Sequence, residues 1–402
     1  MTLLCEAALL ALCGLWICGF LYLSWTALRL PQFHRLQHAP PAEWPSLSIV
    51  IPACNEAATI AGAVESLLRQ DYPNFELILV DDRSTDGTGA IVDRLAARDA
   101  RIRALHVKTL PEGWLGKVHA LQRGVEIAKG DWLLFTDADV HFAAETLRQA
   151  VGWGVNNRID HLALAPLAVQ RSFILDIVVR TFALLFLIGT RAAGVNRAGS
   201  RGFVGVGAFN LVRRACFRRT PGFRWLRLEP CDDVGLGLMI KRAGGRAFFA
   251  FAPQHLTVAW YPSVPAMFKG LEKNLFGATA DYRGWLTVIE TLAIYALATA
   301  PAIALFAGLA ERRRLLLSAG IAALAIHWIF SFWTATEGWR SRLSLLLAPV
   351  GLMMIGAMMV HAAWQCLAQG GIDWRGTRYP LEHLRAGQRV KLSPSSRLFQ
   401  RP

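Results

Sequence analysis

Two aspartates, Asp137 and Asp139, follow directly after the apolar run 132–135 and are separated by one alanine. Side chains two positions apart on extended backbone point to the same side, so both carboxylates can converge on one cation. In open α/β sheets, ligands gather at the carboxyl ends of the strands. Carboxylate oxygens are hard donors that suit Mg²⁺ or Mn²⁺, and such a cation can carry a diphosphate. We therefore predict a divalent-metal site at Asp137 and Asp139; a solvated turn is the alternative.

Other chemically suggestive residues follow two further apolar runs, which begin at Leu47 and Phe75. They are Pro52, Asn55, Glu56, Asp81 and Asp82. Adjacent carboxylates at a strand end repel each other and persist where they are solvated, capped or bound to a ligand. Asn55 and Glu56 could also cap the helix that follows them, because both residue types favour a helix N-terminus. We interpret the group as a candidate ligand-binding set, with which capping is compatible.

Lys117 ends the loop 113–117, which reads Gly-Trp-Leu-Gly-Lys. Small residues let the backbone approach a phosphate closely, and the ammonium group supplies a positive charge. Many surface loops have this composition, so the motif alone is weak evidence. Beside the two aspartates of the expected metal site, we interpret Lys117 as a contact to the diphosphate.

Asp232 and Asp233 precede the segment 236–245, which ends in two glycines, as expected for a helix closed by glycine. A carboxylate in water has a pKa of about 4, so it is ionised at neutral pH and can accept a proton from a hydroxyl group. We name both residues as catalytic candidates. The alternative is that both carboxylates cap the helix.

The segments that must position these residues alternate between strand and helix patterns. The expected order is strand 47–51, helix 58–70, strand 75–80, helix 84–98 and strand 102–107. Such β-α-β-α-β order predicts an α/β fold with a mostly parallel sheet and helices on both faces. With linkers near Pro40-Pro41 and Arg283-Gly284, residues 45–284 form one expected domain, long enough to bury a full core.

Apolar residues make up 54% of the chain and concentrate near its two ends. The run 7–28 is uncharged and fits a transmembrane helix of about 20 residues, so residues 1–30 are expected to be an N-terminal anchor. A cleaved signal peptide is the alternative, but the run is long and no basic segment precedes it.

Three more apolar stretches, 286–309, 315–335 and 343–364, define an expected membrane region at 285–365, followed by a basic tail at 366–402. If all three cross, most basic residues lie opposite the catalytic domain, against the positive-inside rule. We therefore favour a hypothesis in which 286–309 returns to its starting side as a re-entrant or interfacial hairpin, bent at Pro301. The expected location is the bacterial inner membrane, with the catalytic domain facing the cytoplasm.

The net charge of +14 could indicate nucleic acid as a partner, but the sequence has no zinc spacing and no aromatic-basic RNA motif. Attraction to anionic lipid head groups is the simpler explanation. The seven cysteines form no Cys-x-x-Cys pair, which argues against a zinc site and a disulfide framework.

Several of these motifs occur together in the order typical of one family. They are Pro52-x-x-Asn55-Glu56, Val80-Asp81-Asp82, Ser84-x-Asp86-Gly87-Thr88, Gly116-Lys117, Asp137-x-Asp139 and Asp232-Asp233-Val234-Gly235-Leu236. The set resembles a membrane-bound family 2 glycosyltransferase over residues 45–280. Gly113 to Lys117, followed by Ala120-Leu121, is similar to the branch that includes hopanoid-associated and carotenoid glycosyltransferases.

The resemblance implies an A-type glycosyltransferase fold, a nucleotide-sugar donor, most often linked to UDP, and a divalent metal. It implies that Asp81 and Asp82 contact the uracil and ribose, that Asp137 lies at the donor and the metal, and that Asp233 is the general base. Asp232 replaces the usual glutamate of that motif and stays acidic. The expected reaction is an inverting transfer of one sugar.

A membrane lipid is the expected acceptor. Polymerising relatives carry a Gln-x-x-Arg-Trp motif, whereas residues 269–274 read Lys-Gly-Leu-Glu-Lys-Asn. The segment 205–210 resembles the acceptor side of the family, or forms a turn before a buried strand. The stretch 173–188 suggests an amphipathic helix on the bilayer, or an ordinary core helix. The alternatives are a polysaccharide or polyprenyl-phosphate sugar synthase, a catalytically silent membrane scaffold, and a transporter, whose spans would normally carry more polar residues.

Overall fold

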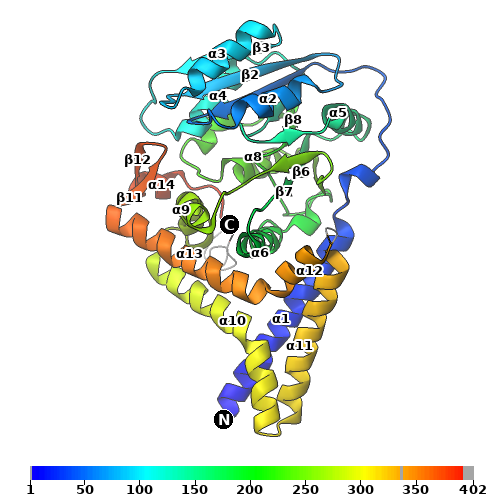
Figure 1. Cartoon of the computed structure of the whole chain (residues 1–402), viewed down its shortest axis with the longest axis vertical. Coiled ribbons are helices and arrows are strands. Elements are labelled where there is room, and N and C mark those ends of the chain that lie inside the picture. The colour runs from blue at the N-terminus through cyan, green and yellow to red at the C-terminus, as the bar shows by residue number, and fades with distance from the viewer. Residues whose placement is uncertain (1, 336–337, 393–402) are drawn as a thin grey trace.

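The computed structural model describes residues 2–335 and 338–392. Its main sheet has seven strands, and six of them are parallel while β8 runs antiparallel to both neighbours. In spatial order they are β3 (Ile102–Val107), β2 (Phe75–Asp82), β1 (Leu47–Ala53), β4 (Trp132–Phe135), β8 (Asn210–Arg213), β6 (His161–Ala165) and β9 (Ala247–Phe251) (Figure 1). The predicted α/β class and the order of the first three strands are confirmed.

Helices cover both faces of this sheet. One face carries α4 (Gly116–Ile127) and α8 (Asp232–Arg242); the other carries α2 (Ile60–Leu68), α3 (Thr88–Arg98) and α5 (Thr146–Asn156). The strands are apolar at nearly every position, so alternate residues enter opposite cores: Ile78 packs with α4, and Leu77 packs with α2. The expected helix 58–70 is therefore present as α2, and the glycine-closed helix as α8.

Short elements complete the domain. A small sheet holds β5 (His141–Phe142), β10 (Leu256–Val258) and β7 (Leu167–Ala168). The short helices are η1 (Phe33–Arg35), η2 (Ala192–Gly194), η3 (Gly222–Leu226) and α7 (Arg214–Phe217).

The parallel register brings three strand ends to one edge. Ala53 of β1 pairs with Asp81 of β2, and Val50 of β1 pairs with Phe135 of β4. Residues that follow β1, β2 and β4 therefore lie close together, although they are far apart in the sequence.

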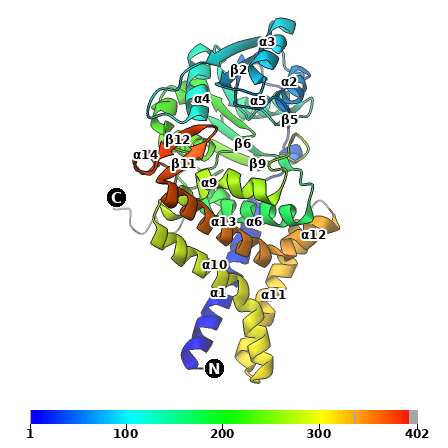
Figure 2. The ribbon, with the colours of Figure 1, turned by 60° about the vertical axis from the view of Figure 1, so that its left-hand side comes forward.

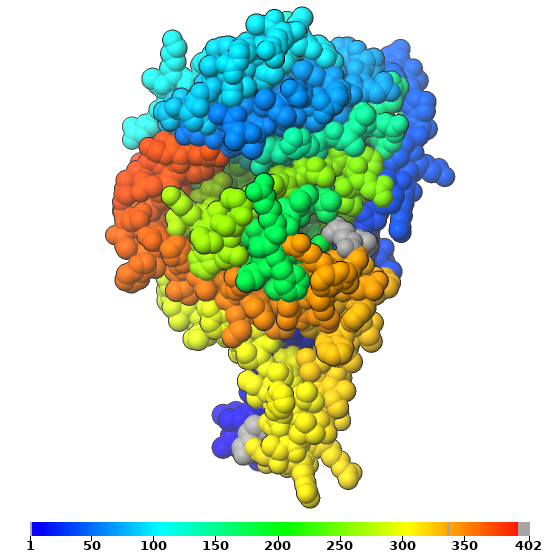
Figure 3. Space-filling model, in the orientation of Figure 1, coloured from blue at the N-terminus to red at the C-terminus, as the bar shows by residue number. Residues whose placement is uncertain are grey.

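Four helices in the described part of the chain are long and apolar enough to cross a membrane: α1 (Leu3–Arg29), α10 (Gly284–Ala310), α11 (Arg314–Thr334) and α13 (Ala348–Gln369). Of these, α1, α11 and the lower part of α10 form a narrow stalk below the broad domain (Figures 1 and 3). Large apolar side chains on the stalk are exposed, including Phe306, Leu315 and Ile329. Such a surface suits contact with lipid rather than water.

Between the stalk and the sheet lies a layer made of α6 (Phe173–Gly189), α9 (Val264–Ala280), α12 (Trp339–Leu346) and α13 (Figure 2). In α6, Asp176 pairs with Arg180 at 3.0 Å and also accepts a hydrogen bond from Ser344 of α12 at 2.5 Å. Helix α6 thus packs inside this layer, and Asp176 anchors it to α12. Its expected position on the bilayer remains a prediction.

The hypothesis of a hairpin within 286–309 is wrong. Residues 284–310 form the single helix α10, which includes Pro301, and the turn after it brings Arg313 to Glu6 at the start of α1. Arg340 instead donates to the backbone of Gln170, beside the domain. The third apolar stretch is also divided, because α12 ends at Leu346 and α13 starts just before Pro349.

The segment expected to be a basic tail is folded as far as the structure describes it. It forms β11 (Gly371–Trp374), β12 (Thr377–Pro380) and α14 (Leu381–Gly387), and the hairpin of β11 and β12 lies against the α/β domain (Figure 2). Residues 393–402 of that expected tail lie outside the described part.

Candidate active site

The centre of the site is a lysine surrounded by aspartates. The Nζ atom of Lys117 lies 2.8 Å from Oδ1 of Asp137 and 3.4 Å from Oδ2 of Asp232. Lys117 comes from the first turn of α4, Asp137 follows β4, and Asp232 begins α8. Three elements that are distant in the sequence thus place their charges in one cluster, and Lys117 does not belong to a solvated surface loop.

Asp233 is fixed beside this cluster by the backbone. Its Oδ2 accepts a hydrogen bond from the Gly207 amide at 2.9 Å, and its Oδ1 accepts one from the Val234 amide at 2.8 Å. Asp137 donates its own amide to the Gly207 carbonyl at 3.1 Å. A β-carbon at Gly207 would lie 2.5 Å from Oδ2 of Asp137. The segment 205–210 is thus both a turn before buried strand β8 and a close spacer between the two aspartates.

Burial controls the charges of the cluster. Burial raises the pKa of Asp233 and of Asp232 above the ordinary value, and Lys117 only partly opposes this effect. Burial would lower the pKa of Lys117, but the surrounding aspartates hold it above its usual range. The side chain of Asp233 is therefore a stronger base than the free carboxylate assumed from the sequence.

The helix-capping alternative for Asp232 and Asp233 finds partial support. Both acids stand in the first turn of α8, where the helix dipole favours negative charge. The N-cap position is Cys231, which makes no capping side-chain bond. The two roles are compatible, because the first turn of α8, which carries both acids, faces Lys117.

Asp139 lines the same cleft as Asp137 but lacks its cationic partner. Burial and then the negative charge of Asp137 raise the pKa of Asp139 to about 7. Burial also disfavours the charged form of Asp137, but Lys117 holds its pKa below the ordinary value. Among the described residues, no group of three or more potential ligands surrounds a metal position. Two oxygen-bearing side chains do fit Mg²⁺ or Mn²⁺ when phosphate and water supply the remaining ligands.

Asp81 and Asp82 diverge in the structure. Asp82 lines the cleft, and Arg83 pairs with it at 2.8 Å. Asp81 is turned toward the neighbouring strand, where the Nδ1 atom of His106 lies 3.0 Å from its Oδ2. Because Asp81 interacts with His106, only Asp82 of this pair lines the cleft.

The residues after β1 also have separate positions. Pro52 and Glu56 line the cleft, whereas the Asn55 side chain accepts a hydrogen bond from the Thr85 amide at 2.8 Å. Asn55 adopts a left-handed backbone with φ 58°, a conformation in which asparagine is enriched. Helix α2 begins only at Ile60, so Asn55 joins two loops rather than capping a helix.

Besides Arg83, four charged or aromatic cleft residues were not among the site residues named from the sequence. Lys273 of α9 reaches the cleft, where burial and then repulsion from Lys117 lower its pKa to about 8. The other three, Trp374, Arg375 and Tyr379, come from the β11–β12 hairpin. Lys273 lies in the stretch 269–274 that was compared with the motif of polymerising relatives, whereas the hairpin carried no recognisable motif.

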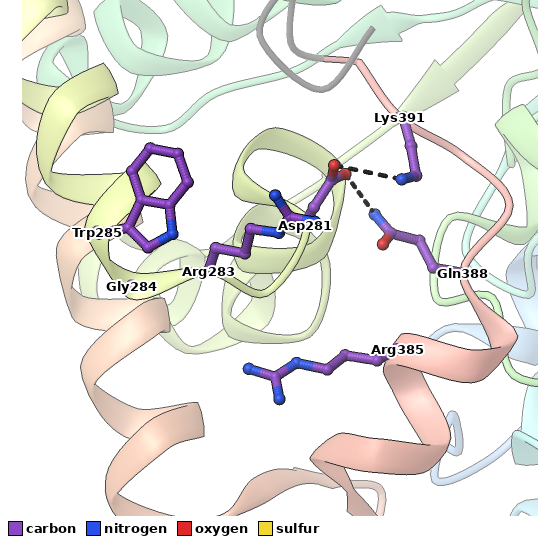
Figure 4. A pocket seen from close by; sticks show the side chains of 7 residues that line it. All are labelled: Asp281, Arg283, Gly284, Trp285, Arg385, Gln388 and Lys391. Carbon is purple, nitrogen blue, oxygen red and sulfur yellow. Dashed lines mark hydrogen bonds and ion pairs between the residues drawn. The ribbon is translucent and has the colours of Figure 1, made fainter. Parts of the chain in front are cut away.

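Together these residues enclose a cavity of about 150 Å³ at the carboxyl edge of the sheet. A separate and wider pocket of about 530 Å³ lies where α9 meets α10, and Figure 4 shows Arg283, Trp285 and Arg385 around it. There Asp281 pairs with Lys391 at 3.3 Å and with Gln388 at 3.2 Å. This pocket shares no residue with the acidic cleft and has none of its converging carboxylates.

Comparison with known proteins gives a consistent result. Residues 48–220 match the model described as Glycosyl transferase family 2. A segment of 93 residues is 39% identical to Glycosyltransferase GlyG of Streptococcus pneumoniae, over 23% of this chain and 30% of that protein. A segment of 110 residues is 37% identical to a PGL/p-HBAD biosynthesis glycosyltransferase of Mycobacterium bovis, over 27% of this chain and 41% of that protein. The chain thus matches less than half the length of these relatives.

A solved structure extends the similarity in fold to most of the chain. It is the mannosyltransferase PcManGT from Pyrobaculum calidifontis in complex with GDP-Man and Mn²⁺, with a TM-score of 0.52 and 22% identity. The alignment covers 90% of this chain and 99% of that one. Residues 48–220 therefore form a glycosyltransferase family 2 domain, set in an A-type fold that carries apolar helices at both ends.

Proposed function

We propose that the chain transfers one sugar, with inversion, from a nucleoside diphosphate sugar to a membrane lipid. The observation that carries the proposal is the cluster in which Lys117 contacts Asp137 and Asp232, with Asp233 alongside. It combines a positive charge for a leaving diphosphate with a buried base. Neither a silent scaffold nor a transporter would need this combination.

The donor would occupy the 150 Å³ cleft and its open mouth. Pro52, Glu56 and Asp82 lie at the end formed by β1 and β2, which suits the nucleoside. Asp137, Asp139 and Lys117 lie toward β4, which suits the diphosphate and sugar. We retain UDP as the expected nucleotide, although the similar mannosyltransferase was solved with GDP-Man. Asn55 and Asp81 support this site through loop contacts rather than by touching the donor.

Asp233 is the proposed general base. The acceptor hydroxyl attacks the anomeric carbon while the bond from that carbon to the phosphate oxygen breaks, and the hydroxyl proton passes to the Asp233 carboxylate. The two backbone amides that hold Asp233 fix its oxygens in the small pocket that Lys117 and Asp137 also line. A single displacement of this kind inverts the anomeric configuration. Asp232 maintains the position and charge of Lys117 during the reaction.

Electrostatic stabilisation of the departing diphosphate is assigned to Lys117 and to a divalent cation. Asp137 and Asp139 would hold Mg²⁺ or Mn²⁺, which would act as a Lewis acid on the phosphate oxygens. The raised pKa of Asp139 fits this assignment, because two close buried carboxylates without a second cation disfavour ionisation. The mannosyltransferase of similar fold was solved with Mn²⁺.

A lipid acceptor is supported by the layer beneath the cleft. Lys273, which lines the cleft, belongs to α9, and α9 packs on the apolar helix α13. Val360, Trp364 and Leu367 on α13 expose large apolar surfaces. A lipid held in a bilayer around the stalk would reach the cleft along this layer. We place the domain on the cytoplasmic face, where nucleotide sugars are made and where free cysteines such as Cys54 stay reduced.

The test is lipid mass spectrometry on membranes that contain the intact chain, incubated with a panel of UDP- and GDP-sugars and Mn²⁺. We expect one lipid to gain the mass of one sugar, with the anomeric configuration opposite to that of the donor. The Asp233→Asn variant is expected to give no such lipid. A product that retains the donor configuration would overturn the proposed mechanism, and a polymeric product would overturn the proposed acceptor.

A further inference from the structure

The chain that leaves the last long apolar helix returns to the proposed donor site. After α13, residues 371–380 form the β11–β12 hairpin, whose tip consists of Arg375 and Gly376. Both tip residues have positive φ, 51° and 75°, as a two-residue turn of this type requires. Arginine rarely adopts this conformation. The turn therefore holds Arg375 in a disfavoured backbone state at the cleft.

The hairpin is attached to the loops that carry the expected nucleotide and phosphate contacts. The Tyr379 hydroxyl accepts a hydrogen bond from the Gly116 amide at 3.1 Å, directly before Lys117. Arg83, which follows Asp82, donates to the Thr377 hydroxyl at 3.0 Å. Farther along the chain, buried Glu229 accepts hydrogen bonds from the Arg389 and Val390 amides at 2.6 and 2.8 Å. These contacts hold the segment against the domain from both sides.

Arg375 is the residue of the hairpin best suited to a phosphate. Its guanidinium pairs with the Glu56 carboxylate at 2.6 Å and donates to the Cys54 carbonyl, and its side chain is 42% exposed. Next to it, the Nζ atom of Lys273 lies 4.0 Å from the centre of the Trp374 ring. The flat guanidinium group binds phosphate oxygens in a two-pronged fashion. Its contact with one partly exposed carboxylate can be exchanged for a diphosphate.

Counted by formal charge, the side chains that line the cavity are balanced without ligands. Four cationic side chains face four acidic ones around the cavity: Arg83, Lys117, Lys273 and Arg375 against Glu56, Asp82, Asp137 and Asp139. A divalent cation adds two positive charges, and a nucleoside diphosphate sugar brings about two negative ones. The formal charge of the site thus stays at zero when both bind together, provided that Arg375 of the hairpin is counted.

We propose that the β11–β12 hairpin completes the donor site and that Arg375 binds the donor diphosphate, leaving Glu56 when the donor enters. This inference rests on the proposed function, because it needs a nucleoside diphosphate ligand. It makes the last folded segment of the chain part of the substrate site. It also links helix α13, from which the hairpin emerges, directly to the donor.

The test compares a nucleoside diphosphate with its nucleoside on the full-length chain in detergent with Mn²⁺, by calorimetry. UDP and uridine form one pair, and GDP and guanosine the other. Arg375→Gln is expected to weaken diphosphate binding about 10- to 100-fold, the usual loss for a hydrogen bond to a charged group, and to leave nucleoside binding unchanged. Arg378→Gln is the matched control, because Arg378 lies on the same hairpin, is exposed, and pairs only with Asp373 among the interactions that the structure gives for it.

Equal diphosphate affinity in the wild type and Arg375→Gln would overturn the inference while leaving the proposed function intact. Equal losses for diphosphate and nucleoside would also overturn it, because the hairpin would then act only as a support. A wild-type chain that binds none of the four probes would overturn the proposed function as well. Hydrogen exchange on the wild type gives a measurement without a variant: exchange of the backbone amides 371–379 is expected to slow with UDP or GDP and not with the nucleoside.

Discussion

Lys117 and Asp137 form a 2.8 Å ion pair at the centre of the cleft, although one begins α4 and the other follows β4. This pair neutralises one aspartate of the Asp-x-Asp motif, whereas the other, Asp139, has no cationic partner within residues 2–335 and 338–392. The asymmetry explains why the pKa values of the two carboxylates move in opposite directions. It also indicates which aspartate gains most from a bound metal.

Asp139→Asn is expected to raise the Mn²⁺ concentration that half-saturates the nucleotide-bound chain by about tenfold or more. A direct metal ligand contributes at least as much to metal affinity as the residues that support ligands. The measurement is Mn²⁺ titration by electron paramagnetic resonance with nucleotide present. Glu126→Gln on the outer side of α4 is a suitable control, because Glu126 pairs with Arg123 away from the cleft. An unchanged Mn²⁺ dependence would remove Asp139 from the metal site.

Asp233→Asn is expected to lower kcat by about 10²- to 10⁴-fold, the usual contribution of a general base, and to leave donor affinity nearly unchanged. The amide is isosteric and can keep one backbone hydrogen bond, so the fold is retained. Single-turnover kinetics together with donor calorimetry separate the two effects. A variant that loses donor affinity but keeps its rate would contradict the assignment.

Gly207→Ala tests the close spacing between the aspartates. The added methyl group would lie 2.5 Å from Oδ2 of Asp137 and 3.5 Å from Oδ2 of Asp233. The Asp137 carboxylate cannot keep its position, whereas the contact to Asp233 is an ordinary van der Waals distance. We therefore expect at least a tenfold loss of activity, about 1.4 kcal/mol in the barrier. Gly14→Ala is the control, because nothing lies within 4 Å of its added carbon. Full activity of the Gly207 variant would show that the aspartates tolerate displacement.

His106 predicts a pH effect on stability. Hydrogen bonds to Asp81 and then Asp93 raise the pKa of His106 in the folded chain. A raised folded pKa contributes stability that is complete below the unfolded pKa of about 6.5 and is lost as pH rises through the folded value. The Tm of the wild type should therefore exceed that of His106→Gln at about pH 5.5. The difference should shrink as the pH rises from about 6.5 through the folded pKa. A constant difference from pH 5 to 9 would contradict this account.

The membrane arrangement can be tested by cysteine labelling. Arg313 contacts Glu6 at the far end of the stalk, whereas Arg378 lies on the hairpin beside the catalytic domain. In a cysteine-free background, a cysteine at Arg312 is expected to react with an impermeant reagent from outside the cell. A cysteine at Arg378 should react only after permeabilisation. Labelling of both positions from the same side would reject this topology.

The sequence by itself determined the class of fold and brought together several residues of the candidate site. Apolar runs separated by helical patterns predicted the strands β1, β2 and β3 in order. Parallel strands necessarily end at the same edge of a sheet. The placement of Asp82, Asp137 and Asp139 at that edge followed from their positions directly after the runs. Lys117 joined them because the glycine-containing loop starts the helix that packs on the same sheet.

Tertiary structure alone decided which of two similar neighbours faces the cleft. Asp81 and Asp82 are adjacent, yet His106 on the next strand engages Asp81 and leaves Asp82 in the cleft lining. Likewise, Asn55 supports a loop while Glu56 faces the site. Because side chains alternate in direction along extended backbone, two adjacent residues are expected to face opposite sides. Which of the two faces the cleft depends on residues elsewhere in the chain.

The position of the C-terminal hairpin could not be predicted from the sequence. Arg83 and Thr377, which form a hydrogen bond, are separated by 294 positions. A basic segment after an apolar helix usually indicates a tail at the lipid surface, and its local pattern contains nothing that names a distant loop. Contacts between such separated segments arise when the whole chain packs, so only the tertiary structure could place Arg375 beside Glu56.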